Sequence, residues 1–340
     1  MKALMYLGPE NMKIVELPEI SPKAGEVKIA IKYVGICGSD LHGYVGKNGR
    51  RIAPMIMGHE FSGVIEEIGD EVKGLKIGDK VTVCPLIECG KCDYCSSGRG
   101  NICPQQRLLG TLDDNGAMVE KLCIDADQIL KLPENMKLET GALIEPFAVA
   151  YSAVKKALPI RNKTVLIIGA GTIGLFILIA AKYFGAKDLI VVDLSKERLQ
   201  KAAELGATCM INPSLEDANE TLKAMGLEKE IDVTFDAVGA GATVQTCLDS
   251  LKNGGISVWV GMMPAQAVTN ISQIVSRELK ILGSYIYTKN DFVDAMRYLG
   301  SGEIDVSSMI SKYVSLHEAE AAFREQLTGL RSIVKVLIQM

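Results

Sequence analysis

The feature that most constrains the fold is a glycine-rich turn between an apolar strand and an apolar helix. Residues 165–174 read VLIIGAGTIG, and an apolar helical pattern continues to Phe184. In a Gly-x-Gly-x-x-Gly turn, Gly169 permits the tight bend, Gly171 lets the backbone approach a pyrophosphate, and Gly174 lets helix and strand pack closely. The segment therefore predicts a nucleotide-binding βαβ unit, and a purely structural glycine-rich turn is the alternative.

An acidic residue follows this turn at the distance that dinucleotide binding requires. Asp193 ends the next apolar strand, about 20 residues further on, where an acid hydrogen-bonds a ribose 2′-hydroxyl. A carboxylate there repels a 2′-phosphate, so we expect NAD and not NADP. Arg198 is of a type that accepts a 2′-phosphate, but it lies further along the chain. We interpret Arg198 as packing against the adenine.

The chain of 340 residues is long enough for two domains. Residues 1–148 carry short alternating segments between turn signals, which predicts an irregular, mostly β domain. Over residues 149–286 apolar strands alternate with helices, which predicts an α/β fold with a doubly wound parallel sheet of the Rossmann type. Residues 287–340 lack this alternation: a helix is followed by a polar loop, a second helix and a final strand. We assign them back to the first domain.

Composition excludes several classes of partner. The formal net charge is −4, from 37 basic and 41 acidic residues, so no basic surplus exists to bind nucleic acid. The longest apolar segment, 165–181, contains three glycines and is shorter than the ~20 residues of a membrane span. The N-terminal residues lack a sustained apolar segment, so we expect no secretory signal, no membrane partner and a cytoplasmic location.

Four of the nine cysteines fall in one short loop. They are Cys89, Cys92, Cys95 and Cys103. Disulfides are rare in a reducing compartment, and this spacing suits a tetrahedral zinc ion with Zn–S bonds of ~2.3 Å. Four protein ligands leave no open position, so the loop predicts a structural zinc lobe over residues 86–106. An iron–sulfur cluster and unpaired structural cysteines are the alternatives.

Three more short motifs contain residue types that bind zinc. Cys37 begins CGSDLH, His59 lies in GHE, and Glu145 precedes a proline. Three protein ligands and one open position form the catalytic zinc pattern. Because the motifs are far apart in sequence, two interpretations stay open at this point: a joint metal site, or a core cysteine with hydrogen-bonded histidines.

The combination of CGSDLH, GHE, the four-cysteine loop, Glu-Pro and GAGTIG with a following Asp resembles the zinc-dependent medium-chain dehydrogenase/reductase family. The resemblance covers essentially the whole chain, and the motifs occur in the family's order. It is greatest to the polyol branch, which comprises the sorbitol (iditol) dehydrogenases and relatives acting on 2,3-butanediol or galactitol 1-phosphate. It implies a GroES-like catalytic domain, two zinc ions per chain (one catalytic, one structural), NAD, and a homodimer or homotetramer.

The resemblance also implies a role for each matching residue. Cys37, His59 and Glu145 match the ligands of the catalytic zinc. Glu60 lies beside that metal, where it exchanges with water or a ligand as a further metal-binding and catalytic residue. Ser39 and His42 match the proton relay, and Asp40 matches an acid that orients the zinc-binding histidine. The residues that match the lining of the cofactor cleft are Ile173, Val260, Gly261 and Ser284.

Two departures from the sorbitol dehydrogenases argue against sorbitol itself. Gly43 stands where they have an aromatic residue after the relay histidine, and Ile286 stands where they have an arginine. Lys47, Arg50 and Arg51 lie between the CGSDLH and GHE motifs. They are interpreted either as ligands of a substrate phosphate or as a solvated charged loop.

The predicted function is zinc-dependent, NAD-linked, reversible oxidation of a secondary alcohol of a small-molecule polyol to a ketone. The proton would leave through Ser39 and His42, and the hydride would pass to nicotinamide. Within the branch, a galactitol-1-phosphate type or a 2,3-butanediol dehydrogenase is the alternative. The remote alternatives are a zinc-free NADPH quinone reductase and a non-enzymatic NAD-binding protein.

Overall fold

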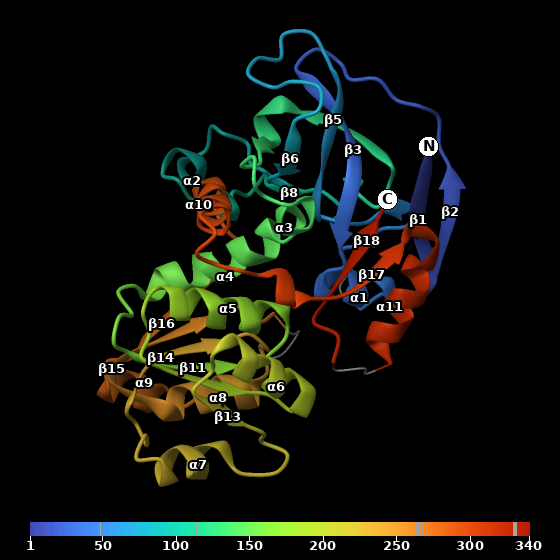
Figure 1. The fold of residues 1–340 in the computed structure, drawn as a ribbon. Coiled ribbons are helices and arrows are strands. Elements are labelled where there is room, and N and C mark those ends of the chain that lie inside the picture. Colours follow the sequence, from blue (N-terminus) through green and yellow to red (C-terminus); the bar gives the residue numbers. More distant parts are fainter. Residues whose placement is uncertain (48, 113, 263–265, 267, 329–331) are drawn as a thin grey trace. The chain divides into compact units, whose positions relative to one another are not determined.

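The protein is described by a computed structural model that covers residues 1–47, 49–112, 114–262, 266, 268–328 and 332–340 (Figure 1). The chain forms two compact units, Met1–Glu145 with Thr288–Met340, and Pro146–Tyr287. The boundaries expected from the sequence, after residues 148 and 286, fall close to these.

The first unit is built mainly of strands. Its largest sheet has the order β10-β6-β5-β3-β18-β17, with β9 paired to β3, and two small sheets, β2-β1-β4 and β7-β8, complete it. The strands are β1 (Lys2–Gly8), β2 (Asn11–Glu16), β3 (Glu26–Gly35), β4 (Met55–Ile56), β5 (Glu60–Ile68), β6 (Lys80–Val83), β7 (Leu86–Ile87), β8 (Arg107–Leu108), β9 (Lys121–Asp125), β10 (Ile129–Lys131), β17 (Ile310–Ser315) and β18 (Lys335–Gln339). The helices are α1 (Gly38–Tyr44), α2 (Asp93–Ser96), α3 (Leu138–Ala142), α10 (Lys289–Gly300) and α11 (Ala319–Leu327).

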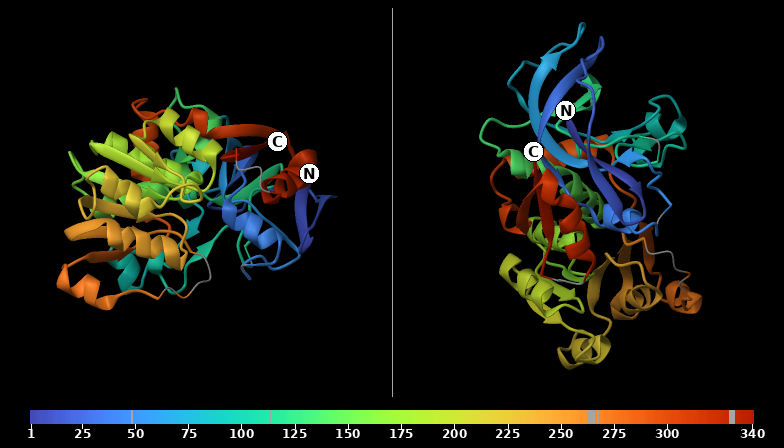
Figure 2. Two further views of the ribbon diagram at one scale, coloured as in Figure 1. Left: turned by 90° about the horizontal axis from the view of Figure 1, so that it is seen from below. Right: turned by 90° about the vertical axis from the view of Figure 1, so that its right-hand side faces the viewer.

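The strands β3, β5 and β18 lie side by side and carry the site described below (Figures 1 and 2). Their buried apolar side chains, such as Val27, Ile29 and Phe61, belong to one continuous core. Helix α1 is held against α11, because the fully buried Tyr44 ring lies 5.4 Å from that of Phe323.

Residues 301–315 were expected to be a polar loop, and this expectation is wrong for their second half. Strand β17 runs from Ile310 to Ser315 and pairs in parallel with β18. It is the last strand of its sheet, and only Val314 is buried. A strand without two or more buried side chains on one face has no apolar alternation to detect.

The second unit is a six-stranded parallel sheet with the order β13-β12-β11-β14-β15-β16 within the described residues. Helices α5 and α6 cover one face, and α7 and α8 cover the other (Figures 1 and 2). The strands are β11 (Thr164–Ile168), β12 (Asp188–Val192), β13 (Cys209–Ile211), β14 (Ile231–Asp236), β15 (Leu251–Trp259) and β16 (Lys280–Gly283). The helices are α4 (Ile144–Ala157), α5 (Thr172–Tyr183), α6 (Lys196–Leu205), α7 (Ala218–Ala224), α8 (Gly241–Ser250) and α9 (Ile271–Ser276).

This arrangement confirms the predicted fold class. The four residues Val165 to Ile168 of β11 are all buried, as are eight consecutive residues of α5 from Gly174 to Ala181. Strands covered on both faces are apolar throughout, and this pattern identified the sheet from sequence. In the part of the chain that is described, every helix is too short or too polar to cross a lipid bilayer.

Candidate functional site

Three side chains that can bind a metal lie together at the ends of two paired strands. The ligand atoms of Cys37, His59 and Glu60 all lie within 4.8 Å of one another. Cys37 caps the N-terminus of α1 directly after β3, and β5 begins at Glu60. Because Gly35 of β3 pairs with Glu60, the antiparallel register brings the two motifs to one place. A thiol, an imidazole and a carboxylate form a donor set that suits zinc.

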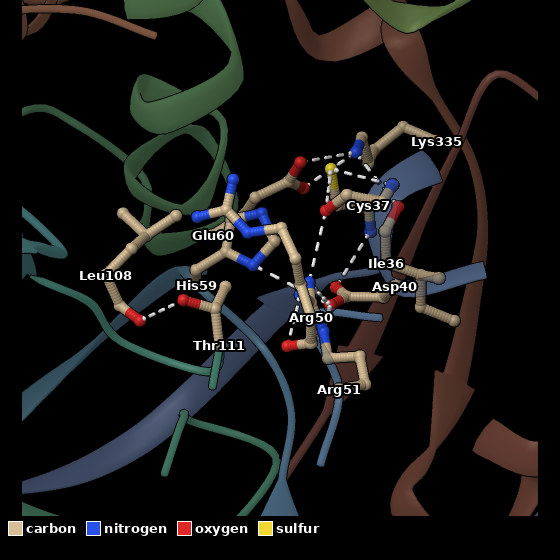
Figure 3. A network of polar contacts seen from close by, with 11 residues as sticks. Ile36, Cys37, Asp40, Arg50, Arg51, His59, Glu60, Leu108, Thr111 and Lys335 are labelled. Atoms are coloured by element: carbon tan, nitrogen blue, oxygen red, sulfur yellow. Dashed lines mark hydrogen bonds and ion pairs between the residues drawn. The ribbon is translucent and has the colours of Figure 1, made fainter. Parts of the chain in front are cut away.

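The carboxylate of Glu60 is held by Lys335 of β18, a residue that sequence reasoning missed. The Lys335 Nζ lies 2.9 and 2.6 Å from the two Glu60 oxygens and donates a 3.0 Å hydrogen bond to the Ile36 carbonyl (Figure 3). Both charged side chains are only 1% exposed. Gly35 makes room for this pair, since a Cβ there would lie 2.1 Å from Glu60 Oε2.

A signal for Lys335 was present in the sequence. It is the only charged residue in the apolar C-terminal segment SIVKVLIQM. A lysine is almost never fully buried without a charged partner, so a lysine inside an apolar strand indicates a buried acid nearby. The sequence alone did not identify Glu60 as that acid.

Burial and the charge of Glu60 have opposite effects on the pKa of Lys335 but act in the same direction on the pKa of Cys37. Burial is the largest single effect on Lys335 and lowers its pKa, but the negative groups around it, Glu60 first and then Cys37 and Glu145, together raise the pKa above its usual value. Burial, followed by the charge of Glu60, raises the pKa of Cys37 to about 11. At neutral pH the Cys37 thiol therefore keeps its proton unless a bound cation displaces it.

Asp40 lies next to His59 but does not hydrogen-bond to it. The Asp40 Oδ1 is 3.7 Å from His59 Nδ1, beyond hydrogen-bond distance. Asp40 instead accepts hydrogen bonds from the Cys37 backbone N–H (3.3 Å) and from Arg51. The His59 Nδ1 is buried and has no hydrogen-bond partner among the described residues. This is consistent with a histidine that binds a metal ion.

The two residues expected to relay a proton lie on α1. The Ser39 Oγ donates a 3.3 Å hydrogen bond to Cys37 Sγ, and Ser39 is exposed. His42 lies in the last turn of the helix and is also exposed. Since residues three apart share one face of a helix, both side chains project on the same side of α1.

Glu145, expected as the third ligand, is not a member of the three-residue group. It is buried in the first turn of α4. Its charge helps to raise the pKa of Lys335, after the larger contributions of Glu60 and Cys37, so it acts on the same cluster. Among the described residues, the carboxylate that groups with the Cys37 thiol and the His59 imidazole within 4.8 Å is that of Glu60.

The three cations between the two motifs occupy different environments. Lys47 is exposed and Arg50 is partly buried. The Arg51 side chain is 1% exposed, and its Nη2 lies 2.6 Å from Asp40 Oδ1. The interpretation of Arg51 as a phosphate ligand stays a prediction, but its interpretation as a solvated charge is therefore wrong. The reason is a backbone bridge between Arg51 and Leu112, which holds this part of the loop against the protein.

The four lobe cysteines converge as their spacing predicts. Their sulfur atoms lie within 4.8 Å of one another, with distances of 3.6 Å for Cys92–Cys95, 3.7 Å for Cys92–Cys103 and 3.9 Å for Cys89–Cys95. A tetrahedron with Zn–S bonds of ~2.3 Å has edges of ~3.8 Å. The spacing fits a single ion and leaves no room for a multi-iron cluster. Backbone N–H groups of Lys91 and Cys92 lower the pKa of Cys89 to about 6, which favours a thiolate.

The glycine turn of the second unit leaves a cradle at the carboxyl ends of β11 and β12. A Cβ on Gly174 would lie 1.7 Å from the Gly169 carbonyl, so helix and strand require glycine there. A Cβ on Gly171, the N-cap of α5, would meet only Arg198 Nη1, at 3.9 Å. Open space at a helix N-terminus fits a pyrophosphate.

The other expected cofactor residues follow neighbouring strands of the same sheet. The Asp193 carboxylate follows β12 and accepts hydrogen bonds of 2.7 Å from the backbone N–H groups of Ala170 and Ser195. Ser284 follows β16, and its buried hydroxyl has no hydrogen-bond partner in the described chain. The remaining three are partly buried: Ile173 in the first turn of α5, and Val260 and Gly261 directly after β15. Ligands of parallel α/β sheets bind at this edge.

Family models match both units. Residues 23–134 match the alcohol dehydrogenase GroES-like domain, and residues 172–301 match the zinc-binding dehydrogenase model. The chain is 34% identical over 342 residues to the sorbitol dehydrogenase of Bacillus subtilis, covering 99% of this chain and 97% of that protein. The chain belongs to the zinc-dependent medium-chain dehydrogenase family. It is an oxidoreductase of the polyol dehydrogenase branch.

Solved structures of this dehydrogenase family share the whole fold. A structure described as a short chain alcohol dehydrogenase from Escherichia coli CFT073, complexed with NADH, superposes with a TM-score of 0.94 at 30% identity and covers 100% of this chain and 99% of its own. Galactitol-1-phosphate dehydrogenase from E. coli gives a TM-score of 0.92 at 29% identity, covering 100% of both chains. The family resemblance read from the motifs is thus confirmed for this dehydrogenase.

Proposed function

We propose that this dehydrogenase catalyses the reversible, NAD-linked oxidation of a secondary alcohol of a polyol to the ketone at a zinc ion. The observation that carries the proposal is the cluster of Cys37, His59 and Glu60, whose ligand atoms lie within 4.8 Å of one another. These three residues would hold the catalytic ion, and Glu145, the third ligand implied by the family resemblance, would supply a further carboxylate. A zinc ion lowers the pKa of an alcohol and stabilises developing negative charge, and NAD accepts the hydride.

The residues of the chain would each do a separate task. Ser39 receives the proton of the alcohol, and His42, one helical turn further, passes it to solvent. Lys335 neutralises Glu60, so that the buried site does not accumulate excess negative charge. The four lobe cysteines would hold a second zinc ion with a purely structural role.

The nucleotide would bind along the glycine turn of the second unit. The Gly171 cradle and the N-terminus of α5 suit a pyrophosphate. Asp193 keeps free lone pairs beyond its two backbone hydrogen bonds, so it can accept the ribose 2′-hydroxyl and would repel a 2′-phosphate. We therefore propose NAD as the preferred cofactor, with Arg198 beside the adenosine.

The substrate class is the less constrained part of the proposal. Sorbitol dehydrogenase, galactitol-1-phosphate dehydrogenase and 2R,3R-butanediol dehydrogenase are all among the similar proteins. The candidates are thus a free polyol, a polyol phosphate and a vicinal diol. Of the three cations considered for a phosphate, only Lys47 and Arg50 are accessible, because Arg51 is engaged by Asp40. We favour a free polyol and expect a cytoplasmic homodimer or homotetramer.

The test combines metal analysis with a substrate panel. Two zinc ions per chain are expected, together with NADH formation from one group of free polyols and a preference for NAD over NADP. Rates that are highest for polyol phosphates and fall in a Lys47→Gln/Arg50→Gln variant would replace the free-polyol assignment. A zinc-free protein that reduces quinones with NADPH would overturn the proposal altogether.

A further inference from the structure

Arg51 is a fully buried cation near the site, and the proposed reaction gives it no role. Its side chain is 1% exposed, and that of Asp40 is 0% exposed. The guanidinium donates two hydrogen bonds to Asp40 Oδ1, at 2.6 Å from Nη2 and 3.2 Å from Nε (Figure 3). A buried ion pair is costly to break from one side, so both groups are held in place.

The same guanidinium reaches the expected proton relay. Arg51 Nη2 also donates a 3.2 Å hydrogen bond to Ser39 Oγ. The Ser39 hydroxyl has a single hydrogen, which it donates to Cys37 Sγ at 3.3 Å. Because Arg51 donates to this oxygen and Cys37 accepts its hydrogen, these two contacts fix the orientation of the Ser39 hydroxyl. Arg51 thus links Ser39 and Asp40, and Asp40 lies beside the His59 ring.

The path of the Arg51 side chain explains why residue 43 is glycine. A Cβ at Gly43 would lie 2.1 Å from Arg51 Cγ, 3.1 Å from its Cβ and 3.3 Å from its Cδ. The arginine stem therefore fills the space into which a side chain at position 43 would project. The next residue, Tyr44, cannot take that place, because its ring is fully buried against Phe323.

We propose that Arg51 is a positioning residue that sets the orientation of Ser39 and the place of Asp40, and that Gly43 is the space it requires. The inference rests on the proposed function for its catalytic consequence. Gly43 and Arg51 thus form a matched pair in this chain. The sorbitol dehydrogenases have an aromatic residue at the position of Gly43, directly after the relay histidine.

The decisive experiment is a double-mutant cycle between Arg51 and Ser39. We expect Arg51→Gln to lower kcat by roughly 30-fold with little change in the KM for NAD, and Arg51→Lys to recover part of the loss. If Arg51 acts through Ser39, then Arg51→Gln in a Ser39→Ala background lowers kcat by less than about threefold. Losses that multiply fully in the double variant would overturn the positioning role, because a merely structural residue gives that result.

A second cycle tests the matched pair by stability and zinc content, without activity. We expect Gly43→Tyr alone to lower the thermal midpoint and the zinc content. In the double variant Gly43→Tyr/Arg51→Ala, the thermal midpoint should fall by less than the sum of the falls in the two single variants. A Gly43→Tyr protein with an unchanged midpoint and two zinc ions would show that Arg51 does not fill this space and would overturn the inference.

The two proposals fail in different ways. If the wild-type protein binds two zinc ions but oxidises no alcohol in the panel, the proposed function fails, while the Gly43–Arg51 cycle still reports on the packing. If the wild type is active and the Ser39–Arg51 losses multiply, only the positioning role fails. A control variant, Lys47→Gln, removes an exposed cation of the same loop and should leave the thermal midpoint unchanged.

Discussion

Two cysteine-containing clusters of the first unit are built in opposite ways. The lobe takes Cys89, Cys92, Cys95 and Cys103 from one short loop and offers four thiols to one ion. The other cluster takes Cys37 from the end of β3 and His59 and Glu60 from the start of β5. Four ligands saturate a tetrahedral ion, whereas three leave a position for a substrate. A closed site can therefore be encoded locally, but an open one depends on strands that are distant in sequence.

The clusters also differ in charge and burial. Three of the four lobe cysteines are partly exposed, and backbone N–H groups support the Cys89 thiolate. Glu60, by contrast, is 1% exposed and has a buried ammonium group, that of Lys335, as its partner. A buried unpaired charge is expensive, so the open cluster depends on an ion pair that the lobe does not need. The comparison predicts that mutations in the two clusters have different kinds of effect.

Loss of the Cys37 thiol should give the largest effect on turnover. We expect Cys37→Ser to lower kcat by about 10³-fold or more, equivalent to about 4 kcal/mol of transition-state stabilisation. NADH binding, measured by fluorescence titration, should stay within about threefold of the wild type because the glycine turn is untouched. The matched control is Cys123→Ser, since Cys123 is a half-buried cysteine of β9 outside both clusters. Normal turnover in Cys37→Ser would remove this cluster from catalysis.

Removal of the buried cation should give the next largest effect, and it should appear in stability. Lys335→Met leaves Glu60 buried without a partner, a change that typically costs ~3–5 kcal/mol. The thermal midpoint should then fall by roughly 10 °C. The control is Lys312→Met, which breaks an exposed 2.6 Å ion pair with Glu325 and should cost ~0–1 kcal/mol. Equal shifts in the two variants would mean that the Lys335–Glu60 pair has no special role.

Loss of one lobe thiol should have a local effect. We expect Cys95→Ser to reduce the zinc content from two ions per chain to one and to increase proteolytic cleavage between residues 88 and 107, because a metal-stabilised loop of this kind has little core of its own. Turnover per zinc-loaded catalytic site should fall by less than about tenfold, since the lobe contributes no reacting group. A loss of turnover as large as that of Cys37→Ser would contradict the distinction between the clusters.

The same difference explains what could be predicted from the sequence. The convergence of the four lobe cysteines and the close packing at the glycine turn could be predicted, because the residues of each motif lie close together in the chain and their spacing implies the geometry. The α/β fold class was also predicted, since buried strands such as β11 are apolar throughout. Strand β17 was missed because only Val314 of its six residues is buried.

The charged environment of the open cluster could not be predicted from local patterns. Nothing near Glu60 in the sequence indicates that Lys335, at the other end of the chain, pairs with it. Arg51 was grouped with Lys47 and Arg50 because three cations in five residues suggest a solvated loop, and its ion pair with Asp40 emerges only from the folded loop. Ion pairs between distant segments depend on strand register, which a single sequence does not reveal.

The smallest predicted effect concerns the rate at which the two clusters lose zinc to a chelator. A chelator can enter the open position of the Cys37 cluster before any protein ligand leaves, whereas in the lobe it must first displace a thiolate, so we expect a rate difference of about tenfold at least. Burial of His59 and Glu60 opposes this order, because the lobe is the more exposed cluster.

Zinc content and activity should therefore be followed together during incubation with excess EDTA. Activity lost with the first ion confirms the open cluster as the faster one; Cys95→Ser should then show only the fast phase and Cys37→Ser only the slow phase. If the first ion leaves without loss of activity, the exposure of a cluster and not its number of protein ligands determines how fast it releases zinc. The contrast between an open and a closed site would then not explain the release rates.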